Sequence, residues 1–516
     1  MPFIILKALK YINAMKSDNF KNVKSFVRAS IAASVGLGNV LRFPGLCAKF
    51  GGGAFLLVYG AATFILGVPL LCTEIALGRK YRSLAPKTFE NLRKGGNLLG
   101  WAAVSNSLTV AIFYAAIIGW ILSMAVGIIP LALSQNTLSS AQIAGWFFNN
   151  VLKSGESYLK SFSPMPLLFT VIGWVIIYFC VKGGASALSK ISKYTLLIPI
   201  ITLSVIAVRG LLYKNGIQAL AALFTPDFSA LLNVELWVAA LGQAFFSLSV
   251  LVGVMPAYGC YAPQNLPVFS SALTIAIADF AVATLAAIAL FTTAYGAGLT
   301  DLIQPSGIAT AFCLYPVAIV SIFPNYPVIS GVFGGIFYLS LLLIALQSTL
   351  SLAQAFIGAL QDKFNLSRKR AQLFTFIPAA IISFFFCSNV GVLLVEICDT
   401  FANGYNLLLL GVLECFTLIS YGNFGGICNG INKNCAHLKM PKKAFTFSLK
   451  YLCPAVLIFL SAACIVNAVT RPNVYPLWAQ LVFGVGASVL VFLSGVLLNV
   501  PKRVIAVRPL KRKKVR

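Results

Sequence analysis

The sequence predicts an all-α membrane protein with twelve transmembrane helices, and its composition and apolar runs both point there. Of the 516 residues, 59% are hydrophobic and only 10% are charged, whereas about a quarter of the residues of soluble domains are charged. Many apolar runs approach or exceed the roughly 20 residues with which a helix crosses a bilayer. They are too continuous for the alternating strands of a membrane β-barrel. The runs occupy residues 53–77, 107–133, 165–181, 194–208, 268–298, 332–360, 371–386, 404–420, 451–469 and 476–500.

The basic residues predict the orientation of these spans. Clusters follow the second, fourth and eighth spans, whereas segments 299–331 and 388–398 contain no Lys or Arg. Cytoplasmic loops carry such an excess of positive charge. Because both end segments are also basic, both termini are expected in the cytoplasm and the number of spans should be even. The net charge of +27 therefore indicates a multi-pass protein of the inner (plasma) membrane and no nucleic-acid partner.

One domain accounts for nearly the whole chain. Residues 1–22 are expected to form a cytoplasmic arm, residues 23–500 the transmembrane domain, and residues 501–516 a basic cytoplasmic tail. The domain divides into two halves, about 23–213 and 236–422, followed by helices 11 and 12 at about 443–500. The proline-rich excursion 299–331 is either a lid or a passive cover.

The sequence gives little sign of an enzyme. The twelve cysteines are scattered through apolar segments and suggest no disulfide framework. Cys428, Cys435 and His437 lack the fourth ligand and the CxxC spacing of a structural zinc site. No nucleophile and base occur together in a span, so we predict that the chain is not an enzyme.

Two spans are interrupted in the middle by small and hydroxyl residues. The first contains SVGLGN at 34–39 and the sixth contains SLSVLVG at 247–253. Broken backbone at mid-membrane is tolerated where it lines a cavity, and paired breaks in two halves indicate a central binding site. Simple packing of helices through small residues is the alternative.

Four acids lie within or at the edge of spans: Glu74, Asp279, Asp399 and Glu414. Intramembrane acids are costly and commonly mark the path of an ion or a substrate. Asp279 has the most apolar neighbours in sequence and should need a cation or a proton.

Several motifs closely resemble the neurotransmitter:sodium symporter family, in its bacterial amino-acid-transporting form. The resemblance covers roughly residues 20 to 500. It is carried by SVGLGNVLRFPG (34–45), GGGAF (51–55), VPLLCTEIALGR (68–79), APKTFE (85–90), AIFYAAIIGW (111–120), WVAALGQAFFSLSV (237–250) and LQDKFNLSRKRA (360–371). It implies the LeuT-type fold, a 5+5 inverted repeat with broken helices 1 and 6 and two extra C-terminal helices. It also implies sodium-coupled import of a neutral, hydrophobic or aromatic L-amino acid by alternating access.

The resemblance also implies a substrate site. Tyr114 matches the tyrosine that holds the substrate carboxylate, and Gly36 stands where carriers of monoamines have an aspartate. The substrate is therefore expected to bring its own carboxylate. The expected lining residues are Ala33, Ser34, Gly36, Leu37, Gly38, Val110, Tyr114, Ile117, Phe246, Ser247, Ser249, Val252, Ser348 and Leu352.

One or two sodium ions are implied. The first is expected at Ser34, Asn39, Ser247 and Asp279, which offer the hard oxygen ligands that suit a hard cation. The second is expected at Ala32, Val35, Ile344, Gln347 and Ser348. Gln347 replaces the usual hydroxyl or acid, and its amide can either bind sodium or plug the site.

Chloride is expected not to be required. Asp279 stands where many relatives have asparagine, so a fixed carboxylate can supply the negative charge that chloride supplies elsewhere. Ala283 occupies the position of a hydroxyl or acid, although Tyr59 and Gln243 match other residues of the chloride site.

Two gates follow from the same resemblance. Arg42 with Asp399 should form the outer gate, assisted by Phe246 and Tyr114, with a plain salt bridge as the alternative. Tyr261 and Asp362 match residues of the inner gate. Their expected N-terminal arginine partner is replaced by Ser17, next to Lys16.

Other functions remain open from the sequence. In a proton-coupled carrier, Asp279 would titrate instead of binding sodium. A receptor or channel on the same scaffold would bind ligand without concentrating it. The resemblance also implies that Glu74 and Glu414, which match two glutamates of the family, lie close together. Like charges in a low dielectric raise one pKa, so the two are expected to share a proton and serve the structure.

Overall fold

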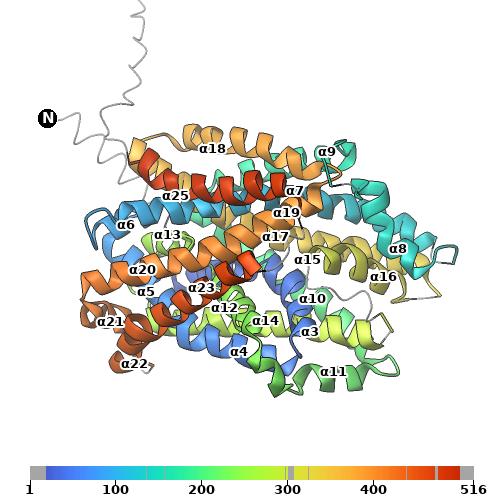
Figure 1. Cartoon of the computed structure of the whole chain (residues 1–516), viewed down its shortest axis with the longest axis horizontal. Coiled ribbons are helices and arrows are strands. Elements are labelled where there is room, and N and C mark those ends of the chain that lie inside the picture. The colour runs from blue at the N-terminus through green and yellow to red at the C-terminus, as the bar shows by residue number, and fades with distance from the viewer. Residues whose placement is uncertain are drawn as a thin grey trace, which may run out of the picture.

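The computed structural model describes residues 19–134, 136–155, 157–296, 298–299, 307–323, 325–436, 438–470 and 475–499. These residues form helices and no strand. Ten of the described helices are long and apolar enough to cross a membrane, and a bent pair adds an eleventh span. Long helices run side by side across the view in Figure 1. Most of the predicted N-terminal arm, the whole C-terminal tail and His437 lie outside the described residues.

The first half of the chain contains the following elements. They are α2 (Val23–Ser34), η1 (Gly38–Arg42), α3 (Phe43–Lys49), α4 (Gly53–Ala61), η2 (Ala62–Gly67), α5 (Val68–Tyr81), α6 (Ala85–Glu90), α7 (Asn97–Leu133), α8 (Ser140–Trp146), η3 (Phe147–Leu152), α9 (Pro164–Val181), α10 (Gly184–Leu211), α11 (Gly216–Phe224) and η4 (Phe228–Leu232).

The second half begins with the other interrupted helix. Its elements are α12 (Val234–Ser247), α13 (Val254–Cys260), α14 (Val268–Gly296), α15 (Gly307–Ala309), η6 (Thr310–Leu314), α16 (Tyr315–Val320), α17 (Pro327–Phe364), α18 (Arg368–Ser383), η7 (Phe384–Cys387), α19 (Gly391–Asp399), η8 (Thr400–Asn406), α20 (Leu407–Tyr421), α21 (Phe424–Asn432), α22 (Lys442–Phe447), η9 (Ser448–Leu452), α23 (Cys453–Thr470), α24 (Leu477–Ala479), η10 (Gln480–Gly486) and α25 (Ala487–Leu497).

The outside of the bundle is apolar, as a lipid-facing surface requires. On α18, Phe374, Ile377 and Ile381 are all more than half exposed, and their spacing places them on one helix face. The inside contains the long contact between α7 and α17, with α10 packed along α14. Polar side chains are buried in this interior, which is where the candidate site lies.

The first span is interrupted as the sequence predicts. The helix α2 begins after Asn22, whose side chain accepts the Ser25 amide in a capping box, and it ends at Ser34. Residues 35–37 separate it from η1 and α3, which continue at an angle of 49°. The break leaves carbonyls at the end of α2 without their usual partners in the next helical turn.

The sixth span is interrupted as well. The helix α12 ends at Ser247, and α13 starts at Val254. Between them Ser249 has φ 54° and Leu251 has φ 68°, a region that residues with a side chain seldom adopt and that often marks functional sites. Glu74 holds this segment, because its Oε1 accepts the Leu251 amide at 2.7 Å. A specific contact therefore fixes the conformation of the segment between α12 and α13.

Gly253 precedes α13 and allows the chain to re-enter a helix after the break. It has φ 71°, and a Cβ placed there would lie 2.7 Å from Val104 Cγ1. We expect Gly253→Ala to destabilise the protein by about 2–4 kcal/mol through left-handed strain and overpacking. The thermal unfolding midpoint in detergent measures this effect. Gly404→Ala is the matched control, because a Cβ at Gly404 would have no atom within 4 Å; equal midpoints for the two variants would contradict the prediction.

Candidate functional site

The two breaks meet at a buried cluster of oxygen atoms around Asp279. Asp279 lies on α14 and is completely buried. Its Oδ1 accepts Asn39 Nδ2 at 2.8 Å, and its Oδ2 accepts Ser247 Oγ at 2.6 Å and the Tyr59 hydroxyl at 3.0 Å. Ser247 Oγ also lies 3.1 Å from Asn39 Oδ1. Residues from four separate spans thus converge on one carboxylate.

This cluster has the chemistry of a site for a small hard cation. It offers a carboxylate, an amide oxygen and a hydroxyl. Asn39 Oδ1 accepts the Gly36 amide at 3.3 Å, which ties the cluster to the first break. Oxygen ligands with one formal negative charge suit a group 1 cation. Of the residues predicted for the first sodium, Asn39, Ser247 and Asp279 are in direct contact.

A small cavity lies beside the cluster, between the two breaks. Its volume is about 20 Å³, about enough for one water molecule. Ser249 Oγ bridges the breaks by donating to the Ala33 carbonyl at 3.0 Å. The hydroxyls of Ser34 and Ser348 have no hydrogen-bond partner among the described residues. The cavity is lined by Ala33, Ser34, Gly36, Asn39, Phe246, Ser249, Val252, Ser348 and Leu352.

A wider cavity of about 400 Å³ lies next to the small one. Phe246 lines both, and its ring packs edge-on against that of Tyr114 with centroids 6.4 Å apart. Leu37, Gly38 and Ile117 also line the wider cavity. Phe246 therefore stands between the two spaces. Of the predicted substrate residues, Ser247 belongs to the oxygen cluster, whereas Val110 is buried on α7 and lines neither cavity.

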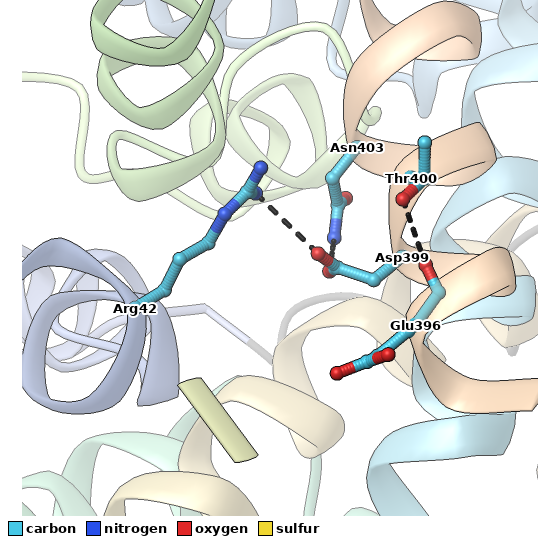
Figure 2. A network of polar contacts seen from close by, with 5 residues as sticks. All are labelled: Arg42, Glu396, Asp399, Thr400 and Asn403. Carbon is cyan, nitrogen blue, oxygen red and sulfur yellow. Dashed lines mark hydrogen bonds and ion pairs between the residues drawn. The ribbon is translucent and has the colours of Figure 1, made fainter. Parts of the chain in front are cut away.

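Arg42 and Asp399 both line the wider cavity, and their side chains point toward each other (Figure 2). Arg42 ends η1 and Asp399 ends α19, and their charged groups lie 3.5 Å apart. Asn403 Nδ2 donates to Asp399 Oδ1 at 2.8 Å and fixes that carboxylate. Because both side chains are more than a quarter exposed, the pair should contribute at most about 1 kcal/mol to stability. Such a weak pair can open and close easily.

The residues expected at the other gate lie at the opposite end of the broken helices. Tyr261 follows α13 and is buried, and its carbonyl accepts the Phe20 amide at 3.0 Å. Asp362 is half-buried near the end of α17. Arg82 donates to two carbonyls on either side of Tyr261, at 2.9 and 2.7 Å. Ser17 and Lys16 lie outside the described residues.

The residues predicted for a second sodium lie on α2 and α17, which contact each other. Ala32 and Val35 belong to the end of α2 and its cap, whereas Ile344, Gln347 and Ser348 share α17. Gln347 is completely buried, and its amide has the Tyr258 hydroxyl as a polar neighbour but no well-aligned hydrogen bond among the described residues. This buried amide requires a polar neighbour, because an unpaired one costs about 1–3 kcal/mol.

Several residues near the cavities were not predicted from the sequence. Glu396, Phe312 and Tyr475 line the wider cavity, and the Tyr475 hydroxyl donates to Glu396 Oε2 at 3.3 Å. Tyr475 comes from the connection between the last two spans, where no motif marks it. The sequence places Arg82 only in the basic cluster that follows the second span. In both cases the signal is a contact between segments far apart in sequence.

Comparison with known proteins identifies the group to which the chain belongs. The model of the sodium:neurotransmitter symporter family matches residues 17–135 and 132–504. An uncharacterized sodium-dependent transporter of Methanocaldococcus jannaschii is 31% identical over 420 residues, covering 80% of this chain and 83% of the relative. The sodium-dependent dopamine transporter of Bos taurus is 25% identical over 513 residues, covering 90% and 72%.

A solved structure shows the same fold. The crystal structure of MhsT in complex with L-phenylalanine superposes with a TM-score of 0.74 at 24% sequence identity, covering 86% of this chain and 99% of MhsT. These relatives are transporters and not enzymes, which agrees with the prediction. The resemblance seen in the sequence motifs is thereby confirmed, and this chain belongs to the sodium:neurotransmitter symporter family.

Proposed function

We propose that this chain imports a neutral, hydrophobic or aromatic L-amino acid by sodium-coupled symport, without a requirement for chloride. The observation that carries the proposal is the convergence of Asn39, Ser247 and Asp279 at the meeting point of two broken helices. A cation held there lies beside the small cavity and can attract the carboxylate of a substrate bound in it. Ion and substrate then favour each other's binding.

The lining of the small cavity supports a neutral amino acid. Phe246, Val252 and Leu352 contribute apolar surface, and none of the lining residues is charged. The unpaired hydroxyls of Ser34 and Ser348 are available to the polar end of a zwitterion. Because MhsT has been solved in complex with L-phenylalanine, an aromatic amino acid is a reasonable first substrate to test with the present chain.

Alternating access would connect the two cavities. The wider cavity has room for an amino acid, whereas the small one must expand to accept it. We propose that the substrate enters past Arg42 and Asp399, that Phe246 swings aside, and that the pair then closes above it. Release on the other side would require the segment around Tyr261 and Asp362 to open.

Chloride independence is supported by the contacts of Asp279. Its Oδ2 accepts hydrogen bonds from Tyr59, which matches a residue of the chloride site of relatives, and from Ser247. The carboxylate oxygen therefore already uses the Tyr59 hydroxyl as a donor, whereas the amide of Gln243 has no hydrogen-bond partner among the described residues. Ala283 lies one helical turn further along α14 and provides no competing group.

The sodium stoichiometry depends on Gln347. An amide oxygen that faces the end of α2 would bind a second ion, whereas an amide that fills the space would exclude it. Each charge moved is worth about 2.3 kcal/mol per 100 mV of membrane potential. The number of sodium ions moved in each transport cycle therefore decides how far the substrate can be concentrated.

The proposed topology is based on the two interrupted spans and on the distribution of basic residues along the chain. With α12 and α13 as the sixth span, the chain has twelve spans, two halves of five and both termini in the cytoplasm of a cell whose inner membrane it crosses. Residues 1–22 and 501–516 would be the cytoplasmic arm and tail. This arrangement is supported by the basic residues after α5 and at the start of α18.

Uptake into proteoliposomes tests the proposal. Radiolabelled neutral amino acids should accumulate when sodium is outside and fail to accumulate when potassium or choline replaces it. Gluconate in place of chloride should leave uptake unchanged, and the steepness of the sodium dependence reports the number of ions. Accumulation driven by a pH gradient without sodium would support a proton-coupled carrier, and binding without accumulation would support a receptor.

A further inference from the structure

A separate basic cavity lies at one end of the bundle, away from the candidate site. It has a volume of about 480 Å³ and shares no lining residue with the two cavities described above. Four of its lining residues are cations, namely Arg79, Lys80, Arg82 and Lys433, and none is an acid. Figure 1 shows α5 and α21, which supply most of this lining, close together at the left of the bundle. We call this space the basic cavity.

Its two arginines are oriented without being neutralised. Arg79 donates to the main-chain carbonyls of Leu266 and Gly430, the latter at 2.6 Å. Arg82 donates to two carbonyls beyond the end of α13. Carbonyl oxygens fix the direction of a guanidinium group but carry no net negative charge. Each arginine has five N–H donors, so some remain for a ligand.

Its two lysines also lack an acidic partner within the described part of the chain. Lys80 Nζ donates to the Tyr421 hydroxyl at 3.1 Å and lies 4.9 Å from the centre of the Tyr81 ring. Lys433 is exposed after the end of α21. Neither lysine takes part in the ion pairs of the described residues. Asp362 is the acid near the basic cavity, since both it and Arg82 lie near Cys260.

The basic cavity is placed at the level of a membrane surface. The apolar span 53–81 ends at Tyr81, and the apolar span 391–421 ends at Tyr421. Tyrosines at the ends of spans lie at the height of lipid headgroups. Basic residues that only set the orientation of the spans in the membrane would be spread over solvated loops. Here four of them surround a single space, two of them half-buried.

We propose that the basic cavity binds a phosphate group, carried either by an anionic phospholipid headgroup or by a soluble phosphate compound. Guanidinium and ammonium groups form strong charge-assisted hydrogen bonds with phosphate oxygens. Basic pockets between transmembrane helices at this depth are suited to lipid headgroups. This site does not depend on the identity of the transported substrate or ion.

The test compares a variant of the basic cavity with a charge-matched control. Lys80→Gln combined with Lys433→Gln removes two cations. It leaves the hydrogen bonds of Arg79 and Arg82 to main-chain carbonyls intact. Lys190→Gln combined with Lys193→Gln removes two exposed cations of α10 instead. The full-length protein in detergent is titrated with dioleoyl phosphatidylglycerol, phosphatidylcholine or inorganic phosphate at constant ionic strength. Binding is followed by native mass spectrometry and by the thermal unfolding midpoint.

The expected result is selective binding of one phosphate source by the wild type and by the control. Loss of two charges should weaken that binding about 30-fold, since each lysine near a membrane surface accounts for about fivefold. Preference for phosphatidylglycerol over phosphatidylcholine without an effect of inorganic phosphate identifies a lipid, and an effect of inorganic phosphate alone identifies a soluble compound.

Two results would overturn the proposal. One is equal binding of phosphatidylglycerol and phosphatidylcholine by the wild type together with no effect of inorganic phosphate, a measurement that needs no variant. The other is an equal loss of binding in the basic-cavity variant and the control. Sodium-driven uptake is a separate readout, so failure of this proposal leaves the proposed transport function standing.

Discussion

Asp279→Asn is expected to make transport dependent on chloride and to weaken sodium binding about 100- to 4,000-fold. The reason is the loss of the single negative charge in the cluster formed with Asn39, Ser247 and Tyr59. Breaking a buried ion pair by removing one partner costs about 3–5 kcal/mol, and each 1.4 kcal/mol is a factor of about ten in affinity. Tyr59 and Ser247 would then be free to donate to an anion.

Uptake in proteoliposomes with chloride or gluconate measures this effect. The wild type should transport equally in both, whereas Asp279→Asn should transport only with chloride and at raised sodium. Ala283→Glu in the same variant is the matched rescue, because residue 283 lies one helical turn from residue 279 and is buried on the same helix. A variant that transports at the wild-type sodium concentration without chloride would contradict the assignment of Asp279.

Gly36→Asp is expected to lower the affinity for a neutral amino acid at least about 100-fold. Gly36 lines the small cavity, where a Cβ would lie 3.0 Å from Ser348 Oγ. An aspartate there would place a second carboxylate beside that of the substrate, and like charges at short range in a poorly solvated site repel each other by several kcal/mol. Binding of radiolabelled amino acid to the purified variant measures the loss.

Gly36→Ala separates charge from bulk. Its methyl group meets only a flexible hydroxyl, so the affinity should fall by about tenfold or less. If Gly36→Asp binds the amino acid as tightly as Gly36→Ala, the substrate carboxylate does not lie near Gly36. The proposed pose would then be wrong.

The main features of the fold could be predicted because the bilayer restricts what a chain can do. Long apolar runs must become helices, and glycine with hydroxyl residues at mid-membrane mark breaks; the structure has α2 ending at Ser34 and α12 ending at Ser247. Boundaries were less accurate. The apolar run at 107–133 belongs to a helix that starts at Asn97, because burial against other helices lets polar residues such as Asn106 join the span.

The site could be predicted in part for a similar reason. Motifs identified Asn39, Ser247 and Asp279, which the structure brings together, but their function stays a prediction. Two contacts could not be predicted: the hydrogen bond from Tyr475 to Glu396, and the hydrogen bond from Arg82 to the Cys260 carbonyl. They join segments far apart in sequence, and composition or periodicity in a single sequence carries no record of such contacts.

The most direct measurement is the sodium dependence of amino-acid affinity in the purified protein. If a cation at Asp279 and the substrate carboxylate stabilise each other, the two ligands must raise each other's affinity by the same factor. L-phenylalanine, or whichever neutral amino acid the uptake panel identifies, should bind at least about tenfold more tightly in sodium than in potassium. Asp279→Ala should abolish the difference. Equal affinity in the two salts for the wild type would contradict the account.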